Sequence, residues 1–332
     1  MLFSRLHMSD IDNQKTQLEK SDLSRVIGNG VVSLIQQTPL TSDSIVLFSY
    51  HLKRKTGSFE KKFLDNGGGP WRTAMDVKGD HYSMVWSSHH AEPASFDSKQ
   101  QTEALFDSFS AFLRRCDLNV RNNLVRTWIY VNDIDNRYNG MVEARKNFFH
   151  SQGLCAESRF VASTGIEGKS ALAGVVVTMD SLSFGNIDER QISIIDALDH
   201  LPRTIRYGVT FERGLRVKFG DRSHLMISGT ASIDKYGKVA YEGDIEKQTH
   251  RAFDNFEALL RSQGATLNDI AYLLCYLRNS GDYECVKEIV NERLPAHIPI
   301  IVVEAAVCRP AWLFEMEGIG IIDDANSFPP FL

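Results

Sequence analysis

The sequence predicts an α+β protein built from two tandem units, each a mixed β-sheet with two helices packed on one face. Its 332 residues are enough for two domains of ordinary size, each with its own hydrophobic core. A segment at residues 101–114 recurs at residues 248–261, and strand-like and helix-like segments follow both copies in the same order. We therefore expect a duplicated supersecondary unit.

In the first unit, residues 101–114 predict a helix because Phe106, Phe109 and Leu113 recur at helical spacing and mark one apolar face. A second helical segment opens at Tyr138 after a polar turn. Apolar runs between turn signals predict the strands of this unit, the first two of them paired as a hairpin. These strands are expected at residues 44–51, 82–87, 124–131, 159–164 and 174–179.

The second unit repeats this order. Residues 248–261 predict a helix with Phe253, Phe256 and Leu260 on its apolar face, and Tyr283 opens the next helical segment. The separation of the two copies is 147 residues at the first helices and 145 at the two tyrosines. Strands are expected at residues 215–219, 225–233, 270–277, 300–307 and 313–322.

These patterns divide the chain into an N-terminal extension at residues 1–40, a degenerate unit at 41–195 and a second unit at 200–325 that carries Glu315. A duplication that preserved a stable fold would explain the repeat without any function. However, the junction between two such units is also a usual position for a ligand pocket.

Composition excludes several classes of function. The net charge is −5, and the basic residues are scattered, so we expect no nucleic-acid partner. The longest apolar stretches, at residues 171–179 and 298–308, are shorter than a membrane span, which takes about 20 residues. Residues 1–25 lack the apolar core of a secretory signal. We therefore expect a cytoplasmic protein with no membrane contact.

The five cysteines form no CxxC pair and are odd in number. This pattern argues against a disulfide framework and against a structural metal site, so no metal is expected. Most of these cysteines are expected to be buried thiols.

Four segments of the second unit carry a recognisable pattern, at residues 207–208, 224–231, 248–264 and 314–319. In their order and spacing, the unit resembles the RidA/YjgF family from residue 207 to residue 322. The family's last strand carries an acid in a ligand cleft, and Glu315 falls at that position. The expected fold is therefore two tandem RidA/YjgF-like domains, similar to chorismate mutase in architecture.

The whole chain resembles the chorismatases, which use two such domains in tandem. The features that carry this resemblance occur in the expected order along both units. They are Trp128 to Tyr130 leading to Asp133, Tyr138 with Arg145, residues 162–166, Tyr207 with Gly208, Phe211 with Arg213, and Cys308 before Glu315.

The resemblance implies an enzyme without a cofactor that cleaves the enolpyruvyl ether of chorismate. Its products would be pyruvate and 3-hydroxybenzoate, or a dihydroxycyclohexadiene carboxylate. Glu315 would be the general acid, and Cys308 would shape the cleft as in the subgroup that makes 3-hydroxybenzoate. A buried structural thiol is the alternative for Cys308.

Chorismate carries two carboxylates, which bidentate guanidinium groups bind well. Arginines at the surface and tyrosines in the core would explain most of the candidate residues equally well. The residues expected to bind substrate are Tyr138, Arg145, Tyr207, Arg213, Arg278, Gly229 and Ala231, with Tyr130 as a further aromatic candidate.

Strand alternation places Glu315 and Glu317 on the same face of the last strand, opposite Phe314 and Met316. Two neighbouring carboxylates can raise the pKa of one of them by repulsion, which suits a proton donor. A solvated sheet face would give the same pattern.

Two alternatives follow from the same residues. RidA-type deaminases hold the substrate carboxylate with an arginine on the strand before the acid, and this position is Ile300 here, which weakens the deaminase hypothesis. A binding module for small carboxylates is the alternative that is not an enzyme. The resemblance also implies a possible homotrimer, although a tandem repeat could supply the same interfaces within fewer chains.

Overall fold

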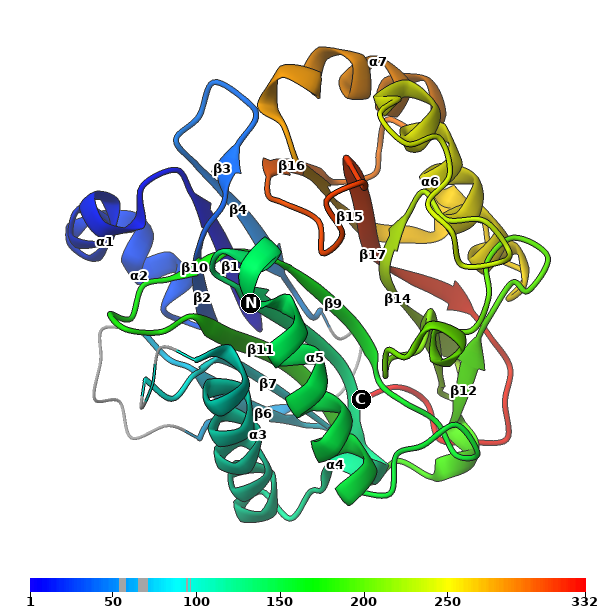
Figure 1. The fold of residues 1–332 in the computed structure, drawn as a ribbon. Helices are drawn as coiled ribbons and strands as arrows, with labels where there is room; N and C mark the ends of the chain where they lie inside the picture. Colours follow the sequence, from blue (N-terminus) through cyan, green and yellow to red (C-terminus); the bar gives the residue numbers. More distant parts are fainter. Residues whose placement is uncertain (54–57, 65–70, 94, 96) are drawn as a thin grey trace.

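The computed structural model describes residues 1–53, 58–64, 71–93, 95 and 97–332, apart from the side chain of Tyr207. These residues form a four-stranded, a six-stranded and a seven-stranded sheet. The helices cover the outer faces of the sheets, and the inner faces of the sheets meet in the middle of the molecule (Figure 1). The predicted α+β class is confirmed.

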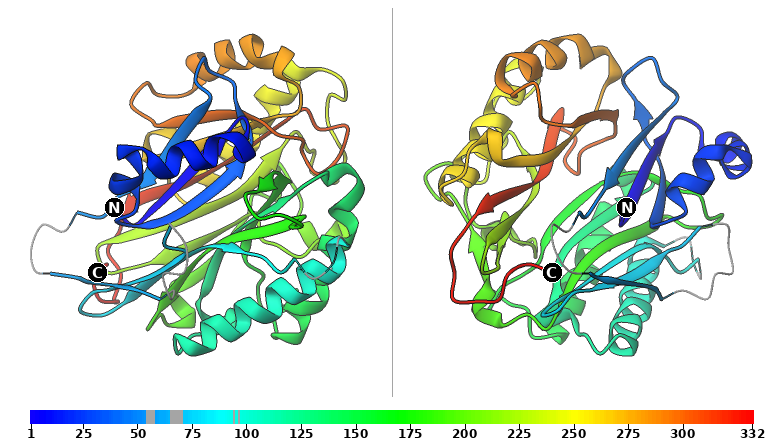
Figure 2. Two further views of the ribbon diagram at one scale, coloured as in Figure 1. Left: turned by 90° about the vertical axis from the view of Figure 1, so that its left-hand side faces the viewer. Right: turned by 180° about the vertical axis from the view of Figure 1, so that it is seen from behind.

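The four-stranded sheet, in the order β10-β2-β1-β4, contains most of the N-terminal extension. Figure 2 shows α1 and α2 on its outer face, where they bury an apolar cluster against β1 and β2. Its elements are β1 (Phe3–Met8), α1 (Ile11–Lys20), α2 (Asp22–Ile27), β2 (Val31–Gln36), β4 (Ile45–Tyr50) and β10 (Lys169–Ser170).

The six-stranded sheet, in the order β5-β6-β7-β11-β8-β9, belongs to the first repeat unit. The helices α3 and α5 pack side by side on its outer face. Its elements are β5 (Glu60–Phe63), β6 (Ala74–Lys78), β7 (Ser83–His90), α3 (Ser98–Arg115), α4 (Val120–Asn123), β8 (Leu124–Val131), α5 (Ile134–Ser151), β9 (Ala162–Glu167) and β11 (Val177–Gly185).

The seven-stranded sheet, in the order β12-β13-β14-β17-β15-β16-β3, belongs to the second unit, and β3 (Thr38–Pro39) joins its edge from the N-terminal extension. Short 3-10 helices lie at residues 189–191, 204–207, 267–269 and 280–282. The other elements are β12 (Ile192–Ile195), β13 (Gly214–Lys218), β14 (Arg222–Ala231), α6 (Ile245–Arg261), β15 (Ile270–Leu277), α7 (Tyr283–Arg293), β16 (Ile300–Glu304) and β17 (Phe314–Asp323).

The repeat is visible in the helix starts and the strand pairing. Asp97 and Asp244, which are 147 residues apart, cap α3 and α6 by accepting hydrogen bonds from Gln100 N at 2.9 Å and Lys247 N at 3.0 Å. In each sheet a central strand (β1, β8 or β15) has one parallel and one antiparallel neighbour. The three sheets therefore share one pairing pattern.

Two sequence-based predictions need correction. Residues 44–51 and 82–87 do not form a hairpin, because β4 pairs with β1 of the N-terminal sheet and β7 pairs with β6. The strand β6 was missed because its residues, 74–78, mix charged and apolar side chains. The helix around Tyr138 begins one turn earlier, at Ile134, after Asp133 in the left-handed conformation.

Candidate active site

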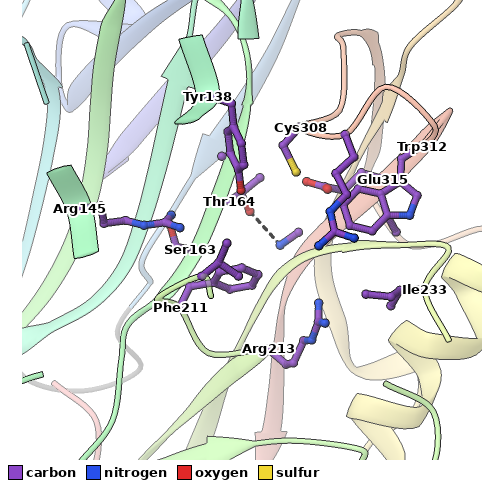
Figure 3. A pocket seen from close by; sticks show the side chains of 15 residues that line it. Tyr138, Arg145, Ser163, Thr164, Phe211, Arg213, Ile233, Cys308, Trp312 and Glu315 are labelled. Atoms are coloured by element: carbon purple, nitrogen blue, oxygen red, sulfur yellow. Dashed lines mark hydrogen bonds between the residues drawn. The ribbon is translucent and has the colours of Figure 1, made fainter. Parts of the chain in front are cut away.

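A pocket lies between the first and second repeat units, where β9 faces β14 and β17 (Figure 3). The helix α5 and the loop between β16 and β17 complete its walls. The space between the walls is about 560 Å³ including the open mouth. It brings together seven of the predicted residues: Tyr138, Arg145, Arg213, Gly229, Ala231, Cys308 and Glu315.

Glu315 lies on β17, paired with Ala231 on one side and Tyr276 on the other. Burial of the carboxyl raises the pKa of Glu315 to about 8, and the neighbouring charge of Glu317 contributes to that rise. The guanidinium groups of Arg213 and Arg126 act in the opposite direction. Glu315 therefore holds a proton at neutral pH, as a general acid requires.

Gly229 allows the backbone to approach this carboxyl. A bulge in β14 between Ile227 and Thr230 brings Gly229 against the Glu315 side chain. A Cβ atom at position 229 would collide with the Glu315 carboxyl and lie 3.2 Å from Thr164 Cγ2. Position 229 therefore favours glycine because a side chain would collide with its neighbours, and not because the backbone has a positive φ angle.

Glu317 is buried beside Glu315 on the same face of β17, so the alternative of a solvated sheet face is excluded. Its Oε2 atom accepts hydrogen bonds from Arg126 and from the Thr164 hydroxyl. Its Oε1 atom accepts from Trp128 Nε1 at 2.7 Å and from the Tyr276 hydroxyl at 3.3 Å. The two carboxyl groups of the strand thus have very different surroundings.

Arg145 provides a buried cation. It lies two helical turns after Tyr138 on α5, so both side chains extend from the same helix face into the pocket. Its Nη1 atom lies 3.4 Å from Ser163 Oγ, whereas its Nε and Nη2 atoms have no partner among the described residues. Because a buried N–H group without an acceptor is costly, this side chain suits an anionic ligand.

Arg213 provides a second cation in the pocket. Its Nε atom donates to Pro202 O at 3.2 Å. The Phe211 ring centre lies 5.8 Å from the Arg213 guanidinium carbon and 5.7 Å from that of Arg145. One aromatic ring therefore contacts both guanidinium groups of the site.

Cys308 lies on the loop between β16 and β17, next to Tyr138 and Glu315. Burial raises the pKa of the Cys308 thiol to about 12, and the charge of Glu315 contributes. Because the thiolate is the reactive form of cysteine, this thiol is not an activated nucleophile. Burial also raises the pKa of Tyr138 well above its ordinary value, so its hydroxyl keeps its proton.

Two of the predicted residues, Arg278 and Tyr130, do not line the pocket. The Arg278 side chain lies outside the pocket lining and binds Asp135 of α5, the carbonyl groups of Val307 and Arg309, and Trp312 O at 3.1 Å. It therefore fixes the loop that carries Cys308.

The Tyr130 side chain is buried in the central core under Arg5, and it does not line this pocket. Tyr207 ends a 3-10 helix, and its side chain lies outside the described part of the chain.

Sequence reasoning missed several lining residues. Ser163, Thr164 and Phe211 lie in segments that carry the chorismatase resemblance, so that resemblance could have identified them. Arg309 and Trp312 have no such signal, because only the folded loop places them beside Glu315. The described residues contain no group of three or more His, Cys, Asp or Glu side chains that could hold a metal. Among them, none of the helices combines the length and the hydropathy needed to cross a membrane.

Comparison with known proteins agrees with the fold and with the repeat. The family model described as Endoribonuclease L-PSP matches residues 217–322. A RutC family protein of Pyrococcus abyssi is 31% identical over 96 residues, which cover 29% of this chain and 76% of that protein. The chain belongs to the RutC family through this C-terminal region.

The predicted chorismatase resemblance is also confirmed. A 3-hydroxybenzoate synthase of Streptomyces hygroscopicus is 26% identical over 222 residues, which cover 60% of this chain. The matched region spans 63% of that protein's length. A crystal structure of a chorismatase superposes with a TM-score of 0.70 and 21% identity, covering 96% of this chain and 92% of that one. The two chains therefore share a fold over almost their whole lengths.

Proposed function

We propose that this protein cleaves the enolpyruvyl ether of chorismate and releases pyruvate, with Glu315 as the proton donor. The observation that carries the proposal is that a protonated carboxyl, Glu315, shares one pocket with the two buried arginines Arg145 and Arg213. The similarity to a 3-hydroxybenzoate synthase and a chorismatase supports the substrate class.

The charges of the pocket suit a dicarboxylate. The Nε and Nη2 atoms of Arg145 have no hydrogen-bond partner among the described residues, and a carboxylate would bind both in a bidentate arrangement. Arg213 contacts the same Phe211 ring and lines the same pocket, so it would place a second positive charge near the other carboxylate. The ring of the substrate would then lie between the two cations, next to Tyr138 and Glu315.

The first chemical step is proton transfer from Glu315 to the terminal methylene carbon of the enol ether. The ether carbon becomes an oxocarbenium centre, which a hydroxyl oxygen attacks while its proton returns to the Glu315 carboxylate. When water attacks, the bond between the ether carbon and the ether oxygen then breaks, the ether oxygen stays on the ring as a hydroxyl, and pyruvate leaves. When the ring hydroxyl attacks, its own bond to the ring and the bond between the ether carbon and the ether oxygen both break, and its oxygen leaves as the carbonyl of pyruvate. The ring carbon that carries the ether oxygen loses its proton, and this proton goes to the ether oxygen, which becomes the hydroxyl of the aromatic product. The route to 3-hydroxybenzoate consumes no water, whereas the route to the dihydroxycyclohexadiene carboxylate consumes one.

Cys308 supports the route to 3-hydroxybenzoate. Its neutral thiol lines the pocket beside Glu315 and adds a small, weakly polar surface. Such a surface favours attack by the hydroxyl of the substrate ring over entry of water. The resemblance also places a cysteine at this position in the chorismatase subgroup that forms 3-hydroxybenzoate.

The test is to incubate the protein with chorismate, follow pyruvate by a coupled assay and identify the ring product by chromatography and mass. We expect activity to be lost in Glu315→Gln and retained in Glu242→Gln, a control at an exposed position. Because the acid form is required, kcat/KM should fall as the pH rises through about 8. Absence of pyruvate with the wild-type protein would disprove the proposal.

A second candidate is deamination of an enamine or imine. A 3-aminoacrylate deaminase RutC of Acinetobacter baylyi is 24% identical over 94 residues, covering 75% of that protein. However, Ile300 faces a different pocket, lined by Phe48 and Tyr272, and gives the Glu315 site no arginine. Ammonia release from 3-aminoacrylate, without pyruvate release from chorismate, would favour this candidate.

A further inference from the structure

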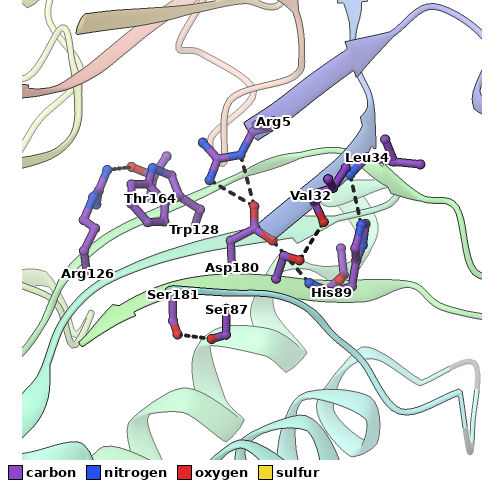
Figure 4. A network of polar contacts seen from close by, with 12 residues as sticks. Arg5, Val32, Leu34, Ser87, His89, Arg126, Trp128, Thr164, Asp180 and Ser181 are labelled. Atoms are coloured by element: carbon purple, nitrogen blue, oxygen red, sulfur yellow. Dashed lines mark hydrogen bonds and ion pairs between the residues drawn. The ribbon is translucent and has the colours of Figure 1, made fainter. Parts of the chain in front are cut away.

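Two buried arginine–carboxylate pairs join the sheets in the middle of the molecule, and Figure 4 shows the pair formed by Arg5 and Asp180. Arg5 of β1 binds Asp180 of β11 through Nε and Nη2, each at 3.0 Å, and Arg126 of β8 binds Glu317 of β17. The Trp128 ring lies between the two arginines, 4.7 Å from the Arg5 guanidinium carbon and 4.8 Å from that of Arg126.

The two carboxylates occupy matching positions of the repeat. Asp180 pairs with Trp128 across the first-unit sheet, Glu317 pairs with Leu274 across the second, and Trp128 and Leu274 are 146 residues apart. In both cases the arginine comes from the central strand of the preceding sheet. The chain therefore contains two versions of one structural pair.

The versions differ two residues earlier on the strand. The position before Glu317 on the same face is Glu315, whereas the matching position before Asp180 is Thr178, whose hydroxyl donates to His90 O at 3.3 Å. A second carboxyl therefore shares the strand face with Glu317 and not with Asp180. Both carboxylates can therefore have the same structural role. Only Glu317 has a neighbouring acid on which it can also act.

Both oxygens of Glu317 accept hydrogen bonds from buried side chains. Arg126 donates to one oxygen and Trp128 to the other, and neither of these side chains can accept a hydrogen bond. The Thr164 hydroxyl also accepts from Gly229 N at 3.0 Å, so it links Glu317 to the backbone that packs against Glu315. The described residues form no hydrogen bond to the Glu315 carboxyl.

From this geometry we propose that Glu317 is a positioning residue for the acid, because its fixed negative charge keeps the proton on Glu315. This inference rests on the proposed role of Glu315. Arg213 of the pocket and the buried Arg126 favour the ionised form of Glu315, and Glu317 opposes them. The charged or titratable groups around Glu315 are Glu317, Arg126, Arg213, Tyr138, Cys308, Arg145 and Arg309.

The experiment compares Glu317→Gln with Asp180→Asn, which makes the matching change in the pair that lacks the neighbouring acid. The titration of the Glu315 carboxyl is followed in the protein without substrate by carbon-13 NMR of labelled glutamate, and Glu315→Gln assigns the signal. We expect the titration midpoint to fall in Glu317→Gln and to stay near pH 8 in Asp180→Asn. With chorismate, kcat/KM of Glu317→Gln at pH 8 should fall about tenfold, with a smaller loss at lower pH.

An unchanged or higher midpoint in Glu317→Gln, or an equal fall in both variants, would show that Glu317 is only structural. If Glu317→Gln does not fold, the wild-type protein provides the second test. There, only the signal lost in Glu315→Gln should titrate near pH 8, and a second buried glutamate titrating there would overturn the proposal. Because the NMR titration needs no turnover, it decides this inference even if chorismate is not the substrate.

Discussion

At the scale of single residues, the site depends on groups that are costly for the free protein. Arg145 and Glu315 are both buried. Among the described residues, the Nε and Nη2 atoms of Arg145 have no hydrogen-bond partner, and no hydrogen bond reaches the Glu315 carboxyl. Such groups lower the free energy of unfolding unless a ligand forms hydrogen bonds or ion pairs with them. They are common in functional sites because ligand binding then supplies the missing interactions.

Replacement of Arg145 tests this view. In Arg145→Met, we expect kcat/KM for chorismate to fall roughly 10²-fold because a charge-assisted contact to a carboxylate is lost. The melting temperature should rise, since the variant removes a buried cation whose Nε and Nη2 atoms have no hydrogen-bond partner among the described residues. Lys146→Met, an exposed change of the same charge on the same helix, is the control for both measurements. An unchanged KM or a lower melting temperature would contradict the assignment of Arg145 as the anion subsite.

Gly229→Ala should displace the Glu315 carboxyl, because the added methyl group collides with it. We expect kcat to fall roughly 10²-fold while KM changes little, since a small misplacement of a catalytic group has an effect of that size. Gly281→Ala, where the added Cβ atom meets no other atom within 4 Å, is the matched control in steady-state kinetics. Full activity of Gly229→Ala would mean that Glu315 has room to move without loss of function.

At the scale of elements, one loop forms a wall of the pocket. The loop between β16 and β17 carries Cys308, and Arg278 at the end of β15 ties it to α5 through Asp135. The site therefore depends on a contact between the two repeat units that neither unit makes alone.

Arg278→Lys should loosen this loop, because one ammonium group cannot bind Asp135 and the loop carbonyl groups together. We expect a loss of roughly 1–3 kcal/mol in the free energy of unfolding and a higher KM, measured by urea denaturation and steady-state kinetics. Arg261→Lys, which removes an exposed guanidinium, should change neither quantity. A stable variant with unaltered KM would show that the loop is held by its own packing.

At the scale of the whole molecule, the three sheets share one interior. The largest buried cluster contains residues of all three sheets, among them Phe3, Trp86, Trp128 and Tyr276. Direct hydrogen bonds also join the repeat units, as from Ser163 N to Ser228 Oγ at 2.9 Å. The candidate pocket is therefore part of the structure that holds the units together.

We expect the chain to unfold in a single cooperative transition, because neither unit can expose its inner face without losing the shared core. Calorimetry should give equal calorimetric and van't Hoff enthalpies, and tryptophan fluorescence should follow the same midpoint as circular dichroism. Two separate transitions would show that the repeat units are independent domains.

The sequence by itself determined the local structure and the class of site. Helical periodicity around Phe106 and Phe253 predicted the helices, and apolar runs predicted β8 and β15 with their observed bounds, because these signals depend on neighbours in the chain. The resemblance to chorismatases identified Glu315, Arg145 and Arg213, which the fold brings into one pocket.

Only the tertiary structure decided which strands pair and which charges meet. Residues 44–51 joined the N-terminal sheet instead of the first unit, and Arg278 became a support of the loop instead of a lining residue. The pairing of Arg126 with Glu317, 191 residues later, has no signature in either segment. Such contacts are set by how complete sheets pack against each other, so the state of Glu315, which depends on them, could not be derived from local sequence.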